Sequence, residues 1–325
     1  MNISTSLRRA KAPLALTAAA LLAASACGGA EAGSSGGDGD KLAGTVKVDG
    51  SSTVAPLSTA AAQLFQDKNS GVKVTVGTSG TGGGFEKFCA GETDISNASR
   101  PIKDEEKAAC EKKGIKFEEF TVANDGLSVV VSKDNDFAEC LTVEQLKKVW
   151  EPGSKVNNWN QIDPKFPDVK LELFGAGTDS GTFDYFTDAI NGEEGASRTD
   201  YNPSEDDNVT VQGVSGSKGG MGYFGLSYYK ENKDKLKVLK IDGGSGCVEP
   251  TQTTVQDSSY KPLARPLFIY PKASSLEKKE VEAFVEYYVE NSAEIAEKAQ
   301  FVPLNPTQDE ELKKALEQLK AAHNS

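Results

Sequence analysis

The sequence predicts an α/β protein with two lobes. The chain has 325 residues, of which 38% are hydrophobic, which is enough for a full core and for two domains of ordinary size. Short β-rich segments alternate with amphipathic segments of helical period, which is α/β order. The alternation begins again after a strand at residues 127–131. We therefore place the start of a second lobe there.

Each predicted element rests on a local pattern. Strands are predicted where β-branched residues cluster, and helices where apolar residues recur every three or four positions. Leu57, Ala61 and Leu64, for example, share one face of a helix at 55–66. In chain order we expect a strand at 45–48, a helix at 55–66, a strand at 72–76, helices at 84–90 and 103–113, a strand at 127–131, helices at 142–150 and 182–190, strands at 236–241 and 265–270, and helices at 276–299 and 309–321.

Residues 1–26 are typical of a signal peptide. Arg8, Arg9 and Lys11 form a basic start, and an apolar run follows from Pro13 to Ala24. This run is shorter than the roughly 20 residues that a membrane-spanning helix needs. Cys27 follows "ASA", which resembles the lipobox of bacterial lipoproteins, with ordinary signal cleavage as the alternative. We expect a lipid on Cys27 that anchors the exported protein to the outer face of the cell membrane.

The segment after the signal is expected to be a flexible tether. Residues 27–43 are rich in glycine, serine and acidic side chains, and such compositions rarely fold. Once the three basic residues of the signal are removed, 33 basic and 48 acidic residues remain, a net charge of −15. Nucleic acid is therefore not an expected partner.

Four cysteines remain after Cys27, and an even number in an exported chain predicts two disulfides. Four cysteines allow three pairings. We favour Cys89 with Cys110 and Cys140 with Cys247, because each pair then lies inside one lobe. Four buried free thiols are the alternative.

The single histidine excludes several enzyme classes. His323 lies in a polar tail where order is not expected, so neither a histidine-assisted nucleophile nor a zinc site with histidine ligands is available. The glycine-rich residues 78–85 lack the lysine of a nucleotide-binding P-loop. "DSGT" at 179–182 resembles one turn of an aspartic protease, but no second such turn occurs. A secreted hydrolase using Asp179 is the alternative of a different class, and we expect no catalytic residue, metal or cofactor.

Three hydroxyl-rich turns share one design: "DGSSTVAP" at 49–56, "GTSGTGGGF" at 77–85 and "GTDSGTFDYF" at 177–186. In each, a strand ends, small hydroxyl residues and glycines follow, and a helix begins. Free N–H groups at a helix start carry partial positive charge, so such turns bind oxyanions without a cationic side chain. Capping of the helices alone is the alternative. Because ligands bind at the carboxyl ends of strands in α/β folds, we expect the three turns to converge on one anion.

Only three arginines remain after the signal peptide: Arg100, Arg198 and Arg265. A planar guanidinium suits a tetrahedral oxyanion better than lysine does. Arg100 is close in sequence to the second turn and is the preferred candidate, with a structural salt bridge as the alternative role. Arg198 and Arg265 are expected to be structural.

Six segments together resemble one family: "DGSSTVAPL", "GTSGTGGGF", "DISNASRPI", "GTDSGTFDYF", "GMGYFGLSYY" and "RPLFIY". Over nearly all of residues 45–320 the chain is similar to the phosphate-binding proteins of bacterial high-affinity phosphate ABC importers. The resemblance implies a type II periplasmic-binding-protein fold with a ligand cleft between two lobes joined by a two-stranded hinge. Residues 44–122 and 262–325 would form lobe 1 and residues 123–261 lobe 2. The implied function is capture of inorganic phosphate by cleft closure and delivery to ABC permease subunits, with the receptor acting as a monomer.

The resemblance also assigns candidate phosphate ligands. The first turn of the family falls on "SST" and the following valine, the second on either of two hydroxyl residues, and the third on Ser-Gly-Thr. These candidates are Ser52, Thr53 and Val54; Ser79 or Thr81; and Ser180, Gly181 and Thr182.

Two positions depart from the best-known members of the family. Arg100 stands where those members carry an aspartate that accepts the phosphate proton, and Ala176 stands where they carry an arginine. We interpret Arg100 as the cation that the third turn lacks. Because sulfate has no proton at neutral pH, a missing acceptor would weaken discrimination, and a receptor for another oxyanion such as sulfate is an alternative. Asp179, Asp206 and Asp207 are the possible replacement acceptors.

Overall fold

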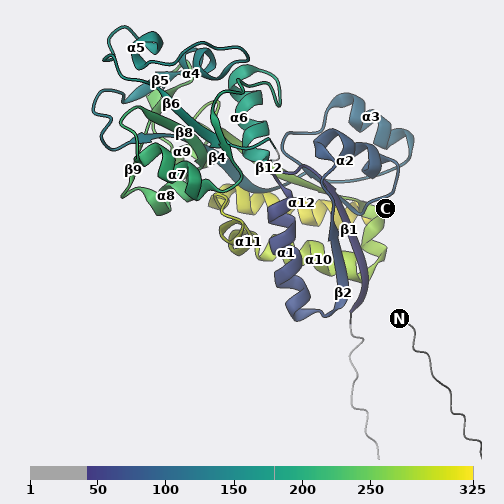
Figure 1. Cartoon of the computed structure of the whole chain (residues 1–325). Coiled ribbons are helices and arrows are strands. Elements are labelled where there is room, and N and C mark those ends of the chain that lie inside the picture. Colours follow the sequence, from purple (N-terminus) through teal and green to yellow (C-terminus); the bar gives the residue numbers. More distant parts are fainter. Residues whose placement is uncertain (1–41, 179, 325) are drawn as a thin grey trace, which may run out of the picture. The chain divides into compact units, whose positions relative to one another are not determined.

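The structure is a computed structural model that describes residues 42–178 and 180–324. The predicted signal peptide, Cys27, most of the tether and Asp179 therefore lie outside the described residues. The described residues belong to one compact unit, in which helices cover a mixed β-sheet (Figure 1).

Helices and strands alternate along the chain, as the sequence predicts. The strands are β1 (Ala43–Gly50), β2 (Gly71–Val76), β3 (Ile95–Ala98), β4 (Phe120–Ser132), β5 (Cys140–Thr142), β6 (Glu172–Ala176), β7 (Asn202–Ser204), β8 (Gly220–Gly225), β9 (Leu236–Val238), β10 (Lys240–Asp242), β11 (Cys247–Val248) and β12 (Ala264–Pro271). The helices are α1 (Ala55–Lys68), α2 (Gly80–Cys89), α3 (Asp104–Lys112), α4 (Val143–Trp150), α5 (Trp159–Ile162), α6 (Gly181–Asn191), α7 (Asp207–Ser215), α8 (Leu226–Asn232), α9 (Gln252–Gln256), the 3₁₀ helix η1 (Ala273–Glu277), α10 (Lys279–Glu290), α11 (Ser292–Lys298) and α12 (Pro306–His323). Of these helices, none combines the length and the apolar character that crossing a membrane requires.

The main sheet has the strand order β2-β1-β3-β12-β4-β8-β6-β7, and β9 also pairs with β4. β1 is parallel to β2 and β3, and β6 is parallel to β7 and β8. β12 and β4 are antiparallel to each other and to their outer neighbours β3 and β8. A separate three-stranded sheet has the order β11-β10-β5.

Two large hydrophobic cores lie along this sheet, and β4 and β12 contribute to both. The first half of β4 supplies Phe120 and Val122 to a core with α1, α10 and α12. Its second half supplies Leu127 and Val129 to a core with α4 and α6. β12 supplies Leu267 to the first of these cores. The residues between the two halves of β4, Asn124, Asp125 and Gly126, are not hydrophobic and separate the two cores.

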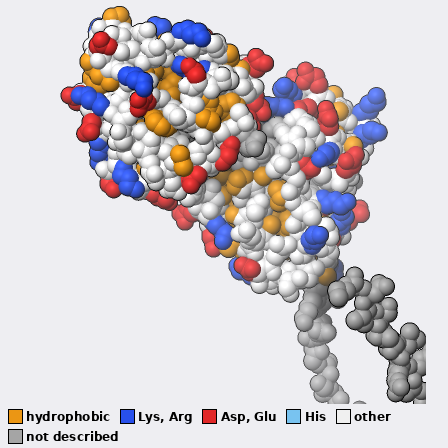
Figure 2. All heavy atoms as spheres, in the orientation of Figure 1, with side chains coloured by type: hydrophobic (Ala, Val, Ile, Leu, Met, Phe, Trp, Pro, Cys, Tyr) orange, Lys and Arg blue, Asp and Glu red, His pale blue; other side chains and the backbone are white. Residues whose placement is uncertain are grey.

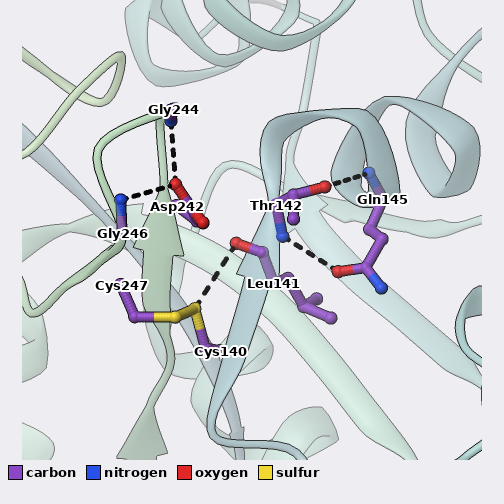
Figure 3. The surroundings of a disulfide bond; sticks show 8 residues. All are labelled: Cys140, Leu141, Thr142, Gln145, Asp242, Gly244, Gly246 and Cys247. Carbon is purple, nitrogen blue, oxygen red and sulfur yellow. Dashed lines mark hydrogen bonds between the residues drawn. A yellow bond between two sulfur atoms is a disulfide. The ribbon is translucent and has the colours of Figure 1, made fainter.

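The disulfides have the pairing that the sequence favours. Cys89 is joined to Cys110, which links the end of α2 to α3, and Cys140 is joined to Cys247, which links β5 to β11. Figure 3 shows the second bond beside the turn after β10, where the Asp242 carboxylate accepts hydrogen bonds from the N–H groups of two glycines. The bond therefore fixes the edge of the small sheet.

Several predicted elements differ in extent from the structure. The predicted helix at 276–299 is three helices, η1, α10 and α11, with a break at Asn291. The predicted strand at 236–241 is split into β9 and β10, which pair with different strands. The prediction that the tail around His323 lacks order was wrong, because α12 continues to that residue. This helix is well supported by the hydrogen bonds of its capping box, formed by Asn305 and Gln308.

Candidate functional site

A cavity of about 690 Å³ with a mostly polar lining lies in the described part of the chain. Its walls come from the first and second hydroxyl turns, the loop after β3, the first turns of α6 and the start of β12. The small hydroxyl side chains of the lining are Ser51, Ser52, Thr53, Thr81 and Ser99, and its cationic side chains are Arg100, Lys103 and Arg265. Residues of all three predicted turn segments are thus brought together at one polar cavity, the third segment through Asp184 and Tyr185.

The first turn reaches the cavity because its backbone at Gly50 lies very close to the backbone of Asn97. Gly50 has a φ of +139°, and a Cβ atom there would lie 2.2 Å from the carbonyl oxygen of Asn97. Only glycine fits such a position. The chain then presents Ser52 and Thr53 to the cavity. Val54 is fully buried and offers no side-chain cap to α1, so the helix start is not occupied by a capping hydroxyl at that position.

In the second turn the sequence leaves Ser79 and Thr81 as alternative ligands, and the structure places these two residues differently. The Ser79 hydroxyl donates to the Asp49 carboxylate at 2.7 Å, and its N–H donates to the same carboxylate at 3.0 Å. Ser79 is not among the residues that line the cavity. Thr81 lines it, within 3.1 Å of the hydroxyl of Ser99. The geometry therefore favours Thr81 as the ligand.

The third turn meets the first turn directly. The Ser180 side chain caps α6 by accepting from the Thr182 N–H at 3.2 Å. The Thr53 hydroxyl donates to the Gly181 carbonyl at 3.4 Å. A Cβ atom on Gly181 would lie 2.7 Å from the Thr53 hydroxyl oxygen, so glycine is required for this contact. Gly181 thus joins the site by packing on Thr53, and Ser180, Gly181 and Thr182 do not line the cavity, whereas Asp184 and Tyr185 of the same segment do.

Arg100 lines the cavity, but its charge is already paired. Its two terminal nitrogens lie 2.7 and 2.8 Å from the two carboxylate oxygens of Glu106, a bidentate ion pair. The pair raises the pKa of Arg100, and the Arg100 hydrogen bond holds the pKa of Glu106 below its usual range against the opposing effect of burial. Glu106 also accepts from the Lys103 N–H at the start of α3. Arg100 is therefore held toward α3.

The other two arginines have different roles from each other. Arg198 is structural, as predicted: it is buried, pairs with Asp200 at 2.7 Å and donates to the carbonyls of Val149 and Val156. Arg265 was expected to be structural too, but it lines the cavity. One of its terminal nitrogens donates to the Thr53 hydroxyl at 3.3 Å. Arg265 therefore contacts a candidate ligand directly.

Carboxylates from α6 and the loop after it also face the cavity. Asp184, Asp188 and Glu194 belong to its lining. Burial and the negative charge of Glu194 raise the pKa of Asp184, while Arg265 and a hydrogen bond from the Ser52 hydroxyl oppose that shift. Asp184 therefore accepts a hydrogen bond from the first turn, and the charge of Arg265 acts on its pKa.

The acids that the sequence offers as proton acceptors are placed elsewhere. Asp206 caps α7 by accepting from the Asn208 N–H. Asp207 lines a smaller cavity of about 120 Å³ that also contains Thr182 and Asp125. Burial and the charges of Asp206 and Glu205 raise the pKa of Asp207 to about 6. Asp179 lies outside the described residues.

Ala176 at the end of β6 is buried and brings no charge to the site. Among residues 42–178 and 180–324, no group of three or more histidine, cysteine, aspartate or glutamate side chains is placed to hold a metal ion. Acidic and basic side chains are interspersed on the face shown in Figure 2. On that face the excess of negative charge is not gathered in one field that would repel an anion.

Several lining residues were not proposed as ligands from the sequence, and two of them, Asp184 and Arg265, contact the first turn. For Asp184 a signal existed, because a residue in the first turn of α6, four positions after Ser180, lies near the capping turn. For Arg265 the sequence contains no comparable signal, because its place depends on the antiparallel register of β12 with β4.

A comparison with protein-family models matches residues 35–292 to the PBP superfamily domain. The protein SphX of Synechococcus elongatus is 49% identical over 262 residues, which are 80% of this chain and 77% of that protein. The phosphate-binding protein PstS of Staphylococcus saprophyticus is 44% identical over 288 residues, 88% of this chain and 87% of that protein.

A solved structure is similar as well. The crystal structure of a possible phosphate binding protein from Planctomyces limnophilus is 47% identical, with a TM-score of 0.81, and the match covers 86% of this chain and 99% of that one.

Proposed function

Because the chain belongs to the PBP superfamily and, within it, to the PstS-type phosphate-binding proteins, we propose that it is an extracytoplasmic receptor for inorganic phosphate that serves an ABC importer. The observation that carries the proposal is the cavity itself. Hydroxyls, helix starts and guanidinium groups from distant parts of the sequence face one polar space. Such donors match the oxygens of a tetrahedral oxyanion.

Capture follows from closure of the cleft around one dehydrated phosphate. In this proposal residues 44–122 with 262–325, and residues 123–261, are the two lobes, and β4 and β12 are the hinge. The ligands are donors of the three turns together with one of the two arginines at the cavity, Arg100 or Arg265. The donors of the turns are Ser52, Thr53, Val54, Thr81, Ser180, Gly181 and Thr182. Ser79 is the weakest of the candidates, because Asp49 engages both of its donors.

Phosphate rather than sulfate is the proposed ligand because the cavity also contains carboxylates. A phosphate that still carries a proton can donate it in a hydrogen bond to Asp184, whereas sulfate at neutral pH has no proton to donate. A fully ionised oxyanion is instead repelled by Asp184, Asp188 and Glu194. The three acids thereby supply the discrimination that Arg100 cannot.

The remaining assignments complete the proposal. The family consists of transport receptors, and this chain is proposed to bind without catalysing a reaction. It acts as a monomer, delivers phosphate to the permease subunits in the membrane and is held at the outer face of the cell membrane by a lipid on Cys27. Mass spectrometry of the membrane-bound form tests the anchor, because a diacylglyceryl group adds a defined mass to the N-terminal peptide.

Calorimetric titration of the exported protein with phosphate and with sulfate tests the function. We expect phosphate to bind at micromolar Kd or tighter, about −8 kcal/mol or better, and sulfate to bind at least about tenfold more weakly. Equal affinities refute the phosphate assignment, and binding of neither anion refutes the receptor.

Removal of one hydroxyl sharpens this test. Thr53→Val keeps the side-chain volume but loses a donor, so phosphate should bind roughly tenfold to a hundredfold more weakly. Thr75→Val is the matched control, because the Thr75 hydroxyl donates to the Val46 carbonyl at 3.3 Å, away from the cavity. An equal loss in both variants would show that the effect is not local.

A further inference from the structure

Arg265 occupies the point where the chain passes between the two cores. It lies on β12 directly opposite Asp125 on β4 in the antiparallel register. Leu127 of β4 belongs to one core and Ala123 to the other, so Asp125 stands between them. The Arg265 side chain is 17% exposed and faces the cavity.

Four groups around Arg265 fix the plane of its guanidinium. The Tyr185 ring of α6 stacks against it, with its centroid 3.5 Å from the guanidinium carbon. The terminal nitrogens donate to the Thr53 hydroxyl and the Ser99 carbonyl, each at 3.3 Å. The Asp125 carboxylate lies 3.5 Å from Nε. The guanidinium therefore touches the first turn, the loop after β3 and α6 at the same time.

These contacts hold Arg265 in place but leave much of its hydrogen-bonding capacity. A charge-assisted bond from a guanidinium is normally 2.7–2.9 Å long, so the two bonds at 3.3 Å are weak and their acceptors are neutral. The distance to Asp125 is that of an ion pair rather than of a good hydrogen bond. An anion oxygen can replace the neutral acceptors and form shorter bonds.

The other cations at the cavity are less suited to this role. Arg100 is bound in bidentate fashion by Glu106, so its charge is neutralised by a carboxylate at 2.7 Å. Lys103 is exposed, and a hydrated ammonium loses little of its solvation there. Burial raises the pKa of Asp125, and the charge of Arg265 opposes this shift. Burial therefore disfavours the ionised form of the carboxyl group that pairs with Arg265.

We propose that Arg265, rather than Arg100, supplies the positive charge that binds the oxyanion, with its guanidinium oriented by Asp125 and Tyr185. This inference rests on the proposed phosphate function and names the residue that sets its affinity. Because the guanidinium already contacts Thr53 of the first turn and packs on α6 beside the third, an anion bound there meets donors from both lobes.

Calorimetry of the exported protein with inorganic phosphate tests the proposal. Arg265→Gln should weaken phosphate binding roughly tenfold to a hundredfold, the range for loss of a charge-assisted hydrogen bond. Arg265→Lys keeps the charge but not the planar fork, and should fall between that variant and the unsubstituted protein. Arg100→Gln tests the alternative arginine and should change the affinity less than threefold, because Glu106 already neutralises Arg100. Full affinity in Arg265→Gln overturns the proposal.

Arg265→Gln alone leaves the buried Asp125 carboxylate unpaired, which can destabilise the fold. A second pair of variants therefore tests the proposal without that unpaired charge. Asp125→Asn with Arg265→Gln removes both charges at nearly constant shape. It should bind phosphate at least tenfold more weakly than Asp125→Asn alone, which keeps the guanidinium. Equal affinities of these two variants overturn the proposal. If the unsubstituted protein binds no phosphate, the proposed function fails, and this is a different result from failure of the arginine assignment.

Discussion

Gly181→Ala is the substitution that most directly tests the contact between the first and third turns. Gly181 is the first residue of α6, and a Cβ atom on it would lie 2.7 Å from the hydroxyl oxygen, 2.9 Å from the Cα and 3.0 Å from the N of Thr53. Two of these three atoms are backbone, so rotation of a side chain cannot relieve the overlap. Either Thr53 moves away or the two turns separate.

The expected cost falls on ligand binding rather than on folding. Overpacking by one methyl group costs about 1–3 kcal/mol in well-packed sites, which corresponds to roughly 5- to 150-fold in affinity. Each turn is anchored in its own core, so separation relieves the strain without disrupting either core. A phosphate that needs donors from both turns does not allow that separation. Alanine also favours a helix more than glycine does, which supports α6.

We therefore expect Gly181→Ala to weaken phosphate binding at least fivefold while the ligand-free melting temperature is unchanged or higher. Titration calorimetry and thermal unfolding measure the two quantities. Gly225→Ala is the control, because a Cβ atom at Gly225 meets no atom within 4 Å and its φ is −60°. Unchanged phosphate affinity in Gly181→Ala would show that the contact with Thr53 is not kept in the liganded state, and the reasoning would be refuted.

Three further predictions concern the disulfides and two acids. The bond between Cys140 and Cys247 closes a sequence separation of 107 and that between Cys89 and Cys110 one of 21. In the chain-entropy model the longer loop contributes about 4.7 kcal/mol and the shorter about 3 kcal/mol, so urea unfolding should show a larger loss for the serine pair at 140 and 247. Folding raises the pKa of Asp207 from 3.8 to about 6, so its carboxyl contributes stability at pH 4 that is lost as the pH rises through 6. Asp207→Asn should therefore raise the free energy of unfolding at pH 7.5 by about 1–3 kcal/mol relative to its effect at pH 4, and a pH-independent difference would contradict this. Asp184→Asn should reduce the preference for phosphate over sulfate at least about tenfold in paired titrations, whereas an unchanged preference would remove Asp184 from the selectivity argument.

Local patterns were sufficient for the elements that have one apolar face. The helix predicted at 55–66 is α1, Ala55–Lys68, because its buried stripe and its proline near the start both favour a helix. β4 shows where such patterns fail. The sequence predicts only 127–131, since asparagine, aspartate and glycine at 124–126 are rare in strands and typical of turns. In the structure the strand runs from Phe120 to Ser132, because β12 and β8 pair along it and satisfy its backbone.

For the candidate site, too, the sequence predicted the local motifs but not the contacts between distant residues. The hydroxyl turns are local motifs, and residues of all three segments line the cavity, as expected from the carboxyl ends of their strands, although Ser180, Gly181 and Thr182 do not. The choice among the arginines is not local. Arg100 is close in sequence to the second turn, yet it forms an ion pair with Glu106, which lies six residues later. Arg265 reaches Thr53 from 212 residues away, and only the register of two antiparallel strands places it there.

The position of Asp125 and Arg265 also links binding to closure. Both lie on the strands that the two cores share, and the guanidinium touches a turn anchored in each core. In the proposed closure, an anion that replaces the weak bonds to Thr53 and Ser99 therefore acts on the two strands proposed as the hinge. A ligand can shift the open and closed populations only by its difference in affinity for them. In the proposed function, Arg265 provides that difference through an anion that also meets donors of both turns in the closed state.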